Sequence, residues 1–187
     1  MDAPLPLAID TLPTPNPDAL MFKLQEPLVE RGSFEYTRAK TGDSPLPKRL
    51  FSLDGVEQVL VTTRFVTVTK REEWRWPELV PAIKGLLREH VASGEPAVHA
   101  EEIVVQTGGD SELGQRISAV IDAQVRPAVA MDGGDVQFVG VTDDMYVELR
   151  LIGACSNCPS AITTLRMGIE TMLMDEFPEI AGVEQVV

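Results

Sequence analysis

The clearest hydrophobic pattern in this chain is a strict alternation close to position 150. Apolar residues occupy every odd position from 145 to 151, and residues with polar groups occupy the even positions between them. A period of two is typical of a strand with one buried face and one exposed face. A second β-rich stretch, 136–141, precedes it and is separated from it by Asp143 and Asp144, so the sequence predicts a hairpin.

Helical periodicity flanks this hairpin on both sides. Apolar residues spaced three and four apart form two stripes, one with Leu113, Ile117, Val120, Ile121 and Val125, the other with Ile162, Leu165, Ile169, Met172 and Leu173. We expect the first helix to follow Ser111 as its N-cap and to end at Pro127, and the second to close at Phe177 and Pro178. A last strand over 183–187 completes the order α-β-β-α-β, with helices on one face of a sheet.

The first part of the chain carries a different pattern. Short β-rich stretches are found at 19–24, 56–61 and 65–69, and the last two predict a hairpin. A helical turn is expected near 49–51. An apolar stripe that includes Ile83 predicts a helix whose approach and first turn contain Pro77 and Pro81.

Residues 93–111 separate these two parts, because they lack sustained periodicity and are rich in glycine, proline and acidic residues. The sequence therefore predicts the α+β class, with two small α+β domains joined by a flexible linker. We place the first domain at 1–94, the linker at 95–110 and the second domain at 111–187.

The net charge of −13 is distributed unevenly along the chain. Residues 1–96 carry 12 Lys and Arg against 14 Asp and Glu, whereas residues 97–187 carry four Arg and no Lys against 15 Asp and Glu. A field of this sign opposes nucleic-acid binding, which depends on phosphate neutralisation. It favours basic protein partners, although an acidic surface also serves solubility alone.

The sequence contains no apolar run near the roughly 20 residues that cross a bilayer, so we expect no membrane partner. The start of the sequence shows neither a cationic segment before an apolar stretch nor an Arg-rich amphipathic presequence. The expected compartment is therefore a bacterial-type cytoplasm.

The candidate chemistry is concentrated in the only two cysteines, Cys155 and Cys158. They lie between the predicted strand that ends near Leu151 and a helix that begins at Pro159, a favourable first helical residue. The helix N-terminus favours the thiolate form and provides N–H donors to a bound sulfur or anion. Thiolates at this spacing suit zinc or an iron-sulfur cluster, and both normally take four ligands.

One chain cannot supply four such ligands with its own cysteines and histidines. His90 and His99 lie in the other domain or the linker. Two chains related by a two-fold axis would present four thiolates at one point, as an isologous dimer allows. A shared and shallow site of this kind suits the delivery of a cofactor.

Three kinds of function are compatible with these residues. They are a cluster carrier, a thiol-disulfide oxidoreductase that uses the CxxC pair, and a zinc-bridged interaction module. The sequence has no βαβ unit before the motif, which disfavours the oxidoreductase. It contains no carboxylate pair or Ser-His constellation that suggests hydrolysis, so we predict a protein that is not an enzyme.

Several longer runs resemble a known family. Asp132-Gly133-Gly134-Asp135, the run from Leu151 to Ser160 around the cysteines, Thr164-Leu165 and Gly168-Ile169-Glu170 resemble the C-terminal domain of the NifU family over about residues 112–187. The first part is similar to the N-terminal domain of Nfu proteins, on runs that are Thr14 to Pro17, Leu50-Phe51, Asp54 to Val56, Phe65 to Lys70 and the Trp-containing approach to the helix.

The resemblance implies a carrier of a 4Fe-4S cluster that bridges the two subunits of a homodimer. Cys155 and Cys158 are then the ligands, and the partners are cluster scaffold proteins and apo iron-sulfur proteins.

Other residues have simpler interpretations. The Asp132 to Asp135 run is explained by a turn whose glycines permit positive φ. Met167, Met172 and Met174 are interpreted as core or interface residues. His90 continues an apolar helical stripe and is expected to be a structural histidine with its hydrogen bonds satisfied.

Overall fold

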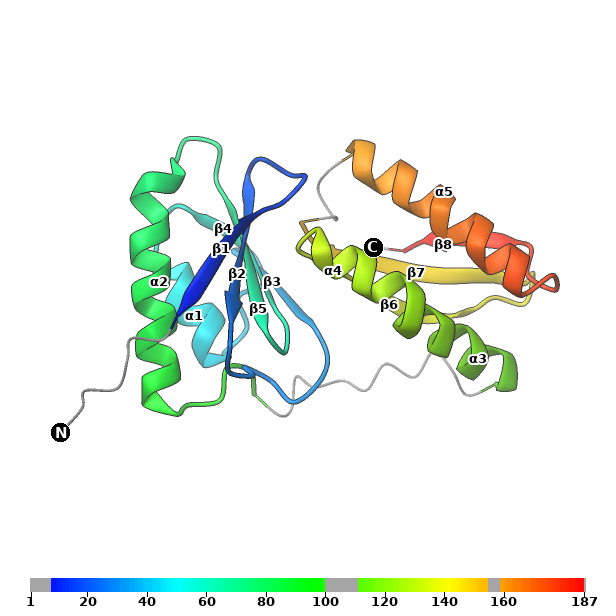
Figure 1. Cartoon of the computed structure of the whole chain (residues 1–187), viewed down its shortest axis with the longest axis horizontal. Coiled ribbons are helices and arrows are strands. Elements are labelled where there is room, and N and C mark those ends of the chain that lie inside the picture. Colours follow the sequence, from blue (N-terminus) through cyan, green and yellow to red (C-terminus); the bar gives the residue numbers. More distant parts are fainter. Residues whose placement is uncertain (1–7, 100–110, 155–158, 187) are drawn as a thin grey trace. The chain divides into compact units, whose positions relative to one another are not determined.

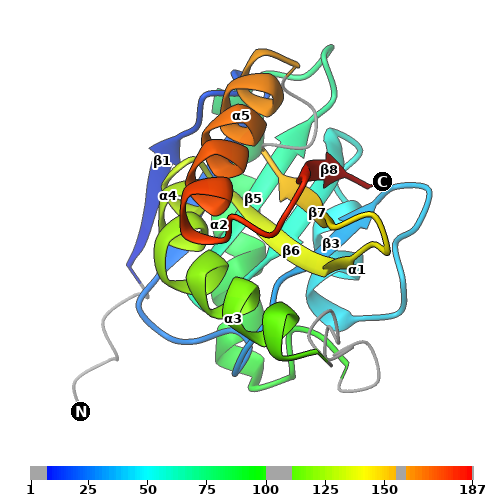
Figure 2. The same cartoon turned by 90° about the vertical axis from the view of Figure 1, so that its right-hand side faces the viewer.

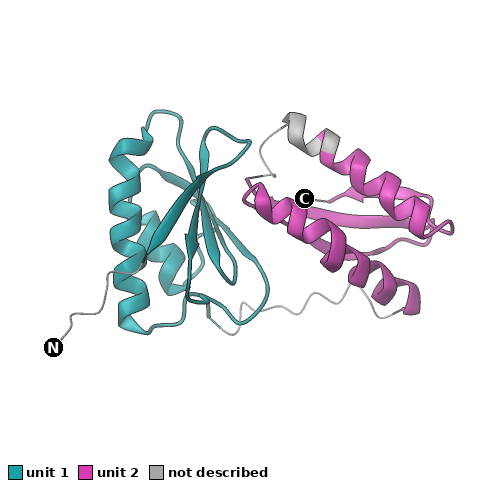
Figure 3. Cartoon of the chain, in the orientation of Figure 1, with its two compact units in different colours: residues 1–104 teal, residues 105–187 magenta. Residues whose placement is uncertain are grey.

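The structure is a computed structural model that describes residues 8–99, 111–154 and 159–186 of the 187-residue chain. It divides into two compact units, unit 1 at 1–104 and unit 2 at 105–187 (Figure 3). Each unit combines helices with a β-sheet, so the predicted α+β class with two domains is confirmed.

Unit 1 is a five-stranded sheet with two helices (Figure 1). Its elements are β1 (Ile9–Pro13), β2 (Ala19–Leu24), β3 (Phe34–Thr37), α1 (Pro45–Phe51), β4 (Val56–Val61), β5 (Phe65–Lys70) and α2 (Trp76–Ser93). The strand order is β1-β2-β5-β4-β3, and every neighbouring pair is antiparallel. The predicted β4–β5 hairpin is confirmed, while β1 and β3 were not predicted.

Apolar side chains from the sheet and from both helices form the core of unit 1. On α2, Leu79, Ile83 and Leu87 are buried at a spacing of four residues, which places them on one face. Pro81 lies inside this helix, so its predicted place in the first turn is wrong. Burial of the apolar face stabilises the helix enough to outweigh the hydrogen bond that proline cannot donate.

The first described residues of the predicted linker pack onto unit 1. Ala97 and Val98 are buried in its core, and the carbonyl of Ala97 accepts a 3.2 Å hydrogen bond from the Leu46 amide. The amide of His99 donates to Ser44 Oγ at 2.9 Å. This segment therefore follows α1 instead of leaving the unit directly after α2. The rest of the linker, 100–110, lies outside the described residues.

Unit 2 is a three-stranded sheet of order β6-β7-β8 with helical segments before and between its strands. Its elements are α3 (Glu112–Val120), η2 (Ile121–Val125), α4 (Arg126–Met131), β6 (Gly134–Val141), β7 (Tyr146–Gly153), α5 (Pro159–Glu176) and β8 (Gly182–Gln185). β6 and β7 are antiparallel, whereas β7 and β8 are parallel and joined through α5. The predicted order α-β-β-α-β is confirmed.

In unit 2, the continuous segment α3-η2-α4 and the helix α5 cover the same face of the sheet (Figure 2). Val147, Leu149 and Leu151 of β7 are buried against them, together with Ile117 of α3 and Ile169 of α5. The alternation in β7 therefore identified the buried face correctly. The strand itself begins only at Tyr146, because Met145 has a positive φ of 65° and belongs to the turn.

The helix that precedes β6 was predicted to end at Pro127, and this prediction is wrong. The chain continues from α3 through a π-helical segment, η2, into α4, and Pro127 lies in the first turn of α4. Proline lacks an N–H and its ring clashes with the carbonyl four residues earlier, and a π-bulge relieves such a conflict by shifting the hydrogen-bond pattern. The predicted N-cap is confirmed, since Ser111 Oγ accepts from the Gly114 amide at 3.0 Å.

Candidate functional site

The candidate site is located where β7 leaves the sheet and α5 begins. The predicted ligands Cys155 and Cys158 lie outside the described residues, but the chain on both sides of them is described. β7 ends at Gly153, and α5 begins at Pro159, directly after Cys158 in the sequence. The four residues 155–158 therefore form the whole connection between Ala154 and the helix.

A glycine turn supports the residue that precedes the first cysteine. Gly133 follows the end of α4 and has a φ of +75°, and its amide donates to the Ala130 carbonyl at 3.1 Å. The carbonyl of Gly133 in turn accepts a 3.3 Å hydrogen bond from the Ala154 amide. The turn expected from Asp132 to Asp135 is therefore present, and it also holds the chain next to Cys155.

Gly153 is the point at which the chain turns out of β7. It pairs with Gly134 of β6 and has a φ of +77°, a conformation that residues with a Cβ rarely adopt. A glycine is therefore required two residues before Cys155 for the backbone to leave the sheet in this direction.

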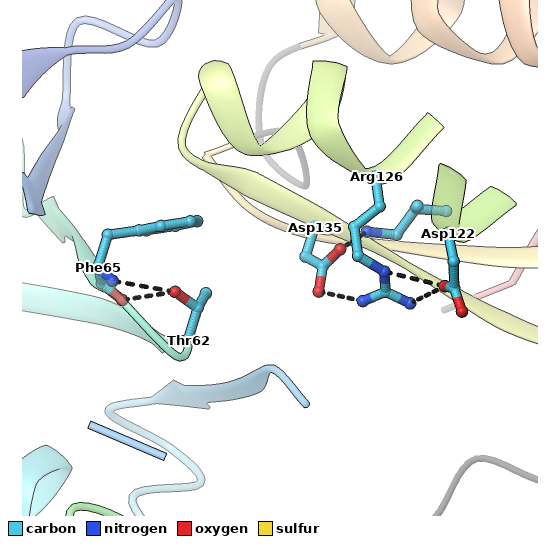
Figure 4. Close-up of polar contacts among 6 residues, drawn as sticks. Thr62, Phe65, Asp122, Arg126 and Asp135 are labelled. Atoms are coloured by element: carbon cyan, nitrogen blue, oxygen red, sulfur yellow. Dashed lines mark hydrogen bonds and ion pairs between the residues drawn. The ribbon is translucent and has the colours of Figure 1, made fainter. Parts of the chain in front are cut away.

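Arg126 and two carboxylates connect the helix to the start of β6 (Figure 4). The Arg126 guanidinium donates to Asp135 Oδ2 at 2.6 Å and, through two nitrogens, to Asp122 Oδ1 at 3.0 and 2.9 Å. Asp135 is buried, and its Oδ1 also accepts from the Val136 amide at 2.7 Å. Asp135 pairs with Ile152 of β7, so this ion pair stabilises the pairing of β6 and β7 close to the point where β7 leads to the cysteines.

Sequence reasoning did not identify Arg126, and it interpreted Asp135 as part of a turn. Asp122 and Arg126 stand four residues apart, a spacing that indicates a surface pair on a helix. The burial of Asp135 had no comparable signal, because it depends on the register between β6 and β7.

The two histidines lie far from the cysteines along the chain, as expected, and His90 is buried in unit 1. The expectation that its hydrogen bonds are satisfied is wrong, because neither ring nitrogen has a partner among the described residues. Burial lowers the pKa of His90 below its ordinary value of 6.5, and the Arg49 cation acts in the same direction. Glu95, which is paired with Arg49, opposes the shift.

We expect His90 to make unit 1 less stable in acid. With a lowered pKa in the folded state, the unfolded chain binds the proton more readily, so stability is lost as the pH falls below about 6.5. His90→Leu should remove this dependence and add about 1 kcal/mol at pH 8, because two buried polar atoms disappear. Trp74 and Trp76 both pack on this core, so tryptophan fluorescence during urea unfolding at several pH values measures the effect.

The exposed His99 provides the control for this prediction. His99→Gln should leave the acid-induced loss of stability unchanged. A pH profile that stays the same in His90→Leu would contradict the assignment of that loss to His90.

Met167, Met172 and Met174 divide between the core and the surface. Met172 packs against the core of unit 2, whereas Met167 and Met174 are exposed by 60% and 41%. Met172 is therefore a core residue, as expected, whereas Met167 and Met174 lie outside the core, and for these two the interpretation as interface residues stays a prediction.

Within 8–99, 111–154 and 159–186, no three His, Cys, Asp or Glu side chains are grouped so that they could hold a metal ion. Among the helices in these same ranges, none has the length and apolar character needed to cross a membrane.

Comparison with known proteins shows similarity in both units. A family model described as "NifU-like domain" matches residues 117–184, and one described as "Scaffold protein Nfu/NifU N terminal" matches residues 9–94.

Curated relatives match almost the whole chain. NFU1 iron-sulfur cluster scaffold homolog, mitochondrial, from Homo sapiens is 41% identical over 182 residues, which cover 95% of this chain and 71% of the relative. NifU-like protein 5, mitochondrial, from Arabidopsis thaliana is 40% identical over 185 residues, which cover 95% of this chain and 67% of the relative. The chain thus spans about two thirds of the length of the Arabidopsis relatives, since the share is 65% for NifU-like protein 4.

One solved structure, the solution structure of a NifU-like protein from Saccharomyces cerevisiae, aligns with a TM-score of 0.48 at 26% identity. The alignment covers 54% of this chain and 91% of that one.

The expected bacterial-type cytoplasm is wrong. The relatives at 40% and 41% identity are named as mitochondrial proteins. Targeting segments are processed separately from the folded domains, so the composition of the first residues did not support a conclusion about the compartment.

Proposed function

This chain belongs to the Nfu family of NifU-like iron-sulfur cluster scaffold proteins, and we propose that it carries a 4Fe-4S cluster between two copies of itself. Cys155 and Cys158 of each copy are the proposed ligands. The cluster is the cargo of the protein, received from an assembly scaffold and passed to apo iron-sulfur proteins.

The shortage of sulfur donors supports the bridged arrangement. Residues 105–187 contain two cysteines and no histidine, whereas a 4Fe-4S cluster takes four protein ligands. A second copy of the chain supplies the missing two thiolates when the two sites face each other across a two-fold axis. The cluster then joins the subunits, and a homodimer is expected in the loaded state.

The position of the motif along the chain supports thiolate ligands. Because α5 begins at Pro159, Cys158 immediately precedes the N-terminus of a helix. This end of a helix carries a partial positive charge and unpaired amide groups. This environment favours thiolate over thiol and stabilises an anionic cluster. Gly153 and the Gly133–Ala154 hydrogen bond hold the chain that leads to the motif.

Transfer requires ligand exchange at iron and no catalytic group of the carrier. A thiolate of the recipient replaces a carrier thiolate, and each iron keeps its coordination number during the exchange. A site shared by two chains opens when the chains separate, so the recipient gains access to the cluster. The membership of a scaffold family agrees with a non-enzymatic role.

Anaerobic reconstitution with iron and sulfide tests this function. We expect the full chain to bind about two iron and two sulfide per polypeptide, which is one 4Fe-4S cluster per dimer. Light scattering after size exclusion should show that the coloured species is dimeric. A colourless protein that reduces a disulfide substrate, or one that retains zinc and takes up no iron, would contradict the proposal.

A further inference from the structure

One side of α5 is left uncovered by the rest of unit 2 (Figures 1 and 3). Thr163, Met167, Thr171 and Met174 are exposed, and their spacing of three and four residues places them on one side of the helix. The opposite side, with Ile169 and Leu173, is buried in the core. We call the exposed side, with these four residues and Gly168, the α5 surface.

The α5 surface is more apolar than the fold of unit 2 requires. Among the described residues, five large hydrophobic side chains are exposed, and two of them, Met167 and Met174, lie on this surface. Exposed methionines that lie together mark interaction surfaces more often than isolated apolar residues do, because the flexible thioether adapts to different partners.

Gly168 lies in the interior of α5 and has no packing reason to be glycine. A Cβ built at this position would meet no described atom within 4 Å, and the φ of this residue is not positive. Glycine in the interior of a helix is unfavourable relative to alanine. A missing side chain on an exposed helix lets the backbone of another molecule come close.

The charge of unit 2 defines the kind of partner. Residues 105–187 carry four Arg and no Lys against 13 Asp and Glu. Next to the α5 surface by helical spacing, Glu170 and Asp175 outnumber the single cation on this helix, Arg166. Attraction therefore favours a partner whose apolar contact residues are bordered by lysine or arginine.

We propose that the α5 surface is the docking site for proteins that exchange the cluster with this chain, through an apolar segment bordered by basic residues. This proposal rests on the proposed function and deepens it. Met167 lies eight residues after the start of α5, so it is about 12 Å along the helix from the end next to Cys158. A partner bound here holds its own ligands close to the cluster.

Gly168→Arg is the test variant, and Gly85→Arg of α2 is its matched control. Both glycines are helical and lack positive φ, and no described side chain lies within 4 Å of a built Cβ, so both helices accept the same substitution. At position 168 the arginine covers the α5 surface and adds a charge that repels basic partners. A third variant, Gly168→Ala, should raise the melting temperature of unit 2 by about 4 °C, because alanine favours the helix more than glycine and no described side chain packs against this position.

Binding is measured with a synthetic probe, an 18-residue amphipathic helical peptide with leucine on one face and lysine at its borders. By fluorescence anisotropy, wild type and Gly85→Arg should bind it within twofold of each other, and Gly168→Arg at least tenfold more weakly. A peptide with glutamate in place of lysine should not bind. Release of iron from the loaded protein to a small chelator needs no docking. Its rate should therefore be equal in wild type, Gly85→Arg and Gly168→Arg.

Equal peptide binding by Gly168→Arg and Gly85→Arg would overturn the docking site. So would a loss of the dimer in loaded Gly168→Arg without peptide, because the surface would then contact the second copy of the chain. Failure of the proposed function is distinguishable from both outcomes, because wild type would then take up no cluster whether or not it binds the peptide.

Discussion

Cys155→Ser is expected to abolish stable cluster binding and the dimer that depends on it. A serine hydroxyl is a poor ligand for iron-sulfur clusters compared with a thiolate, and the substitution acts twice, because both copies of the chain lose one of two sulfur donors. We expect iron and sulfide after anaerobic reconstitution to fall at least tenfold. The absorbance of the cluster and the dimer should disappear together, which one reconstituted sample measures by size exclusion with light scattering.

Cys158→Ser should give the same result, since neither thiolate has a substitute in residues 105–187. Ser156→Ala is the matched control, because it changes the same segment without removing sulfur. It should keep the cluster and the dimer. A Cys155→Ser protein that stays coloured, dimeric and able to transfer its cluster would exclude the bridged arrangement.

The elements with long periodic stretches were predictable from sequence. β7 alternates from Tyr146 to Leu151 and α5 carries an apolar stripe, so both were found. β1 and β3 were missed, since they have five and four residues and form the two edges of their sheet. An edge strand this short carries too little alternation to be distinguished from a loop. Its pairing, such as Ile9 opposite Leu24, depends on the fold of the whole unit.

The continuation of the helix beyond Pro127 was not predictable from local rules. Proline normally ends a helix, and a sequence does not show that a π-helical segment will precede it. The consequence for the site is direct. Because the helix continues beyond Pro127, α4 ends only at Met131, shortly before the glycine turn that holds Ala154.

The candidate site was likewise predictable from sequence only in part. The cysteines were proposed as ligands from their spacing and from the absence of other cysteines, both of which are properties of the sequence. The residues that support the cysteine segment are assembled by long-range pairing. Asp135 becomes buried only because β6 pairs with β7, and Gly133 reaches Ala154 only through the same register.

Arg126→Met is expected to destabilise unit 2 by about 2–3 kcal/mol. The buried Asp135 carboxylate loses a cation at 2.6 Å, and breaking a buried ion pair from one side commonly costs about 3–5 kcal/mol. Arg126 itself is 36% exposed, so water replaces part of the lost interaction and the expected value is lower. Both tryptophans lie in unit 1, so urea unfolding of unit 2 is best followed by amide NMR signals from β6 and β7.

Asp122→Asn is the matched control, because it removes the second partner of the same arginine. Asp122 is 56% exposed and pairs across one turn of helix, so its loss should change stability by no more than about 0.5 kcal/mol. A double-mutant cycle of Arg126→Met with Asp135→Asn should show coupling, because the amide no longer needs the cation. Equal effects of Arg126→Met and Asp122→Asn would mean that the Asp135 contact does not stabilise unit 2. The cysteine segment would then depend on the glycine turn alone.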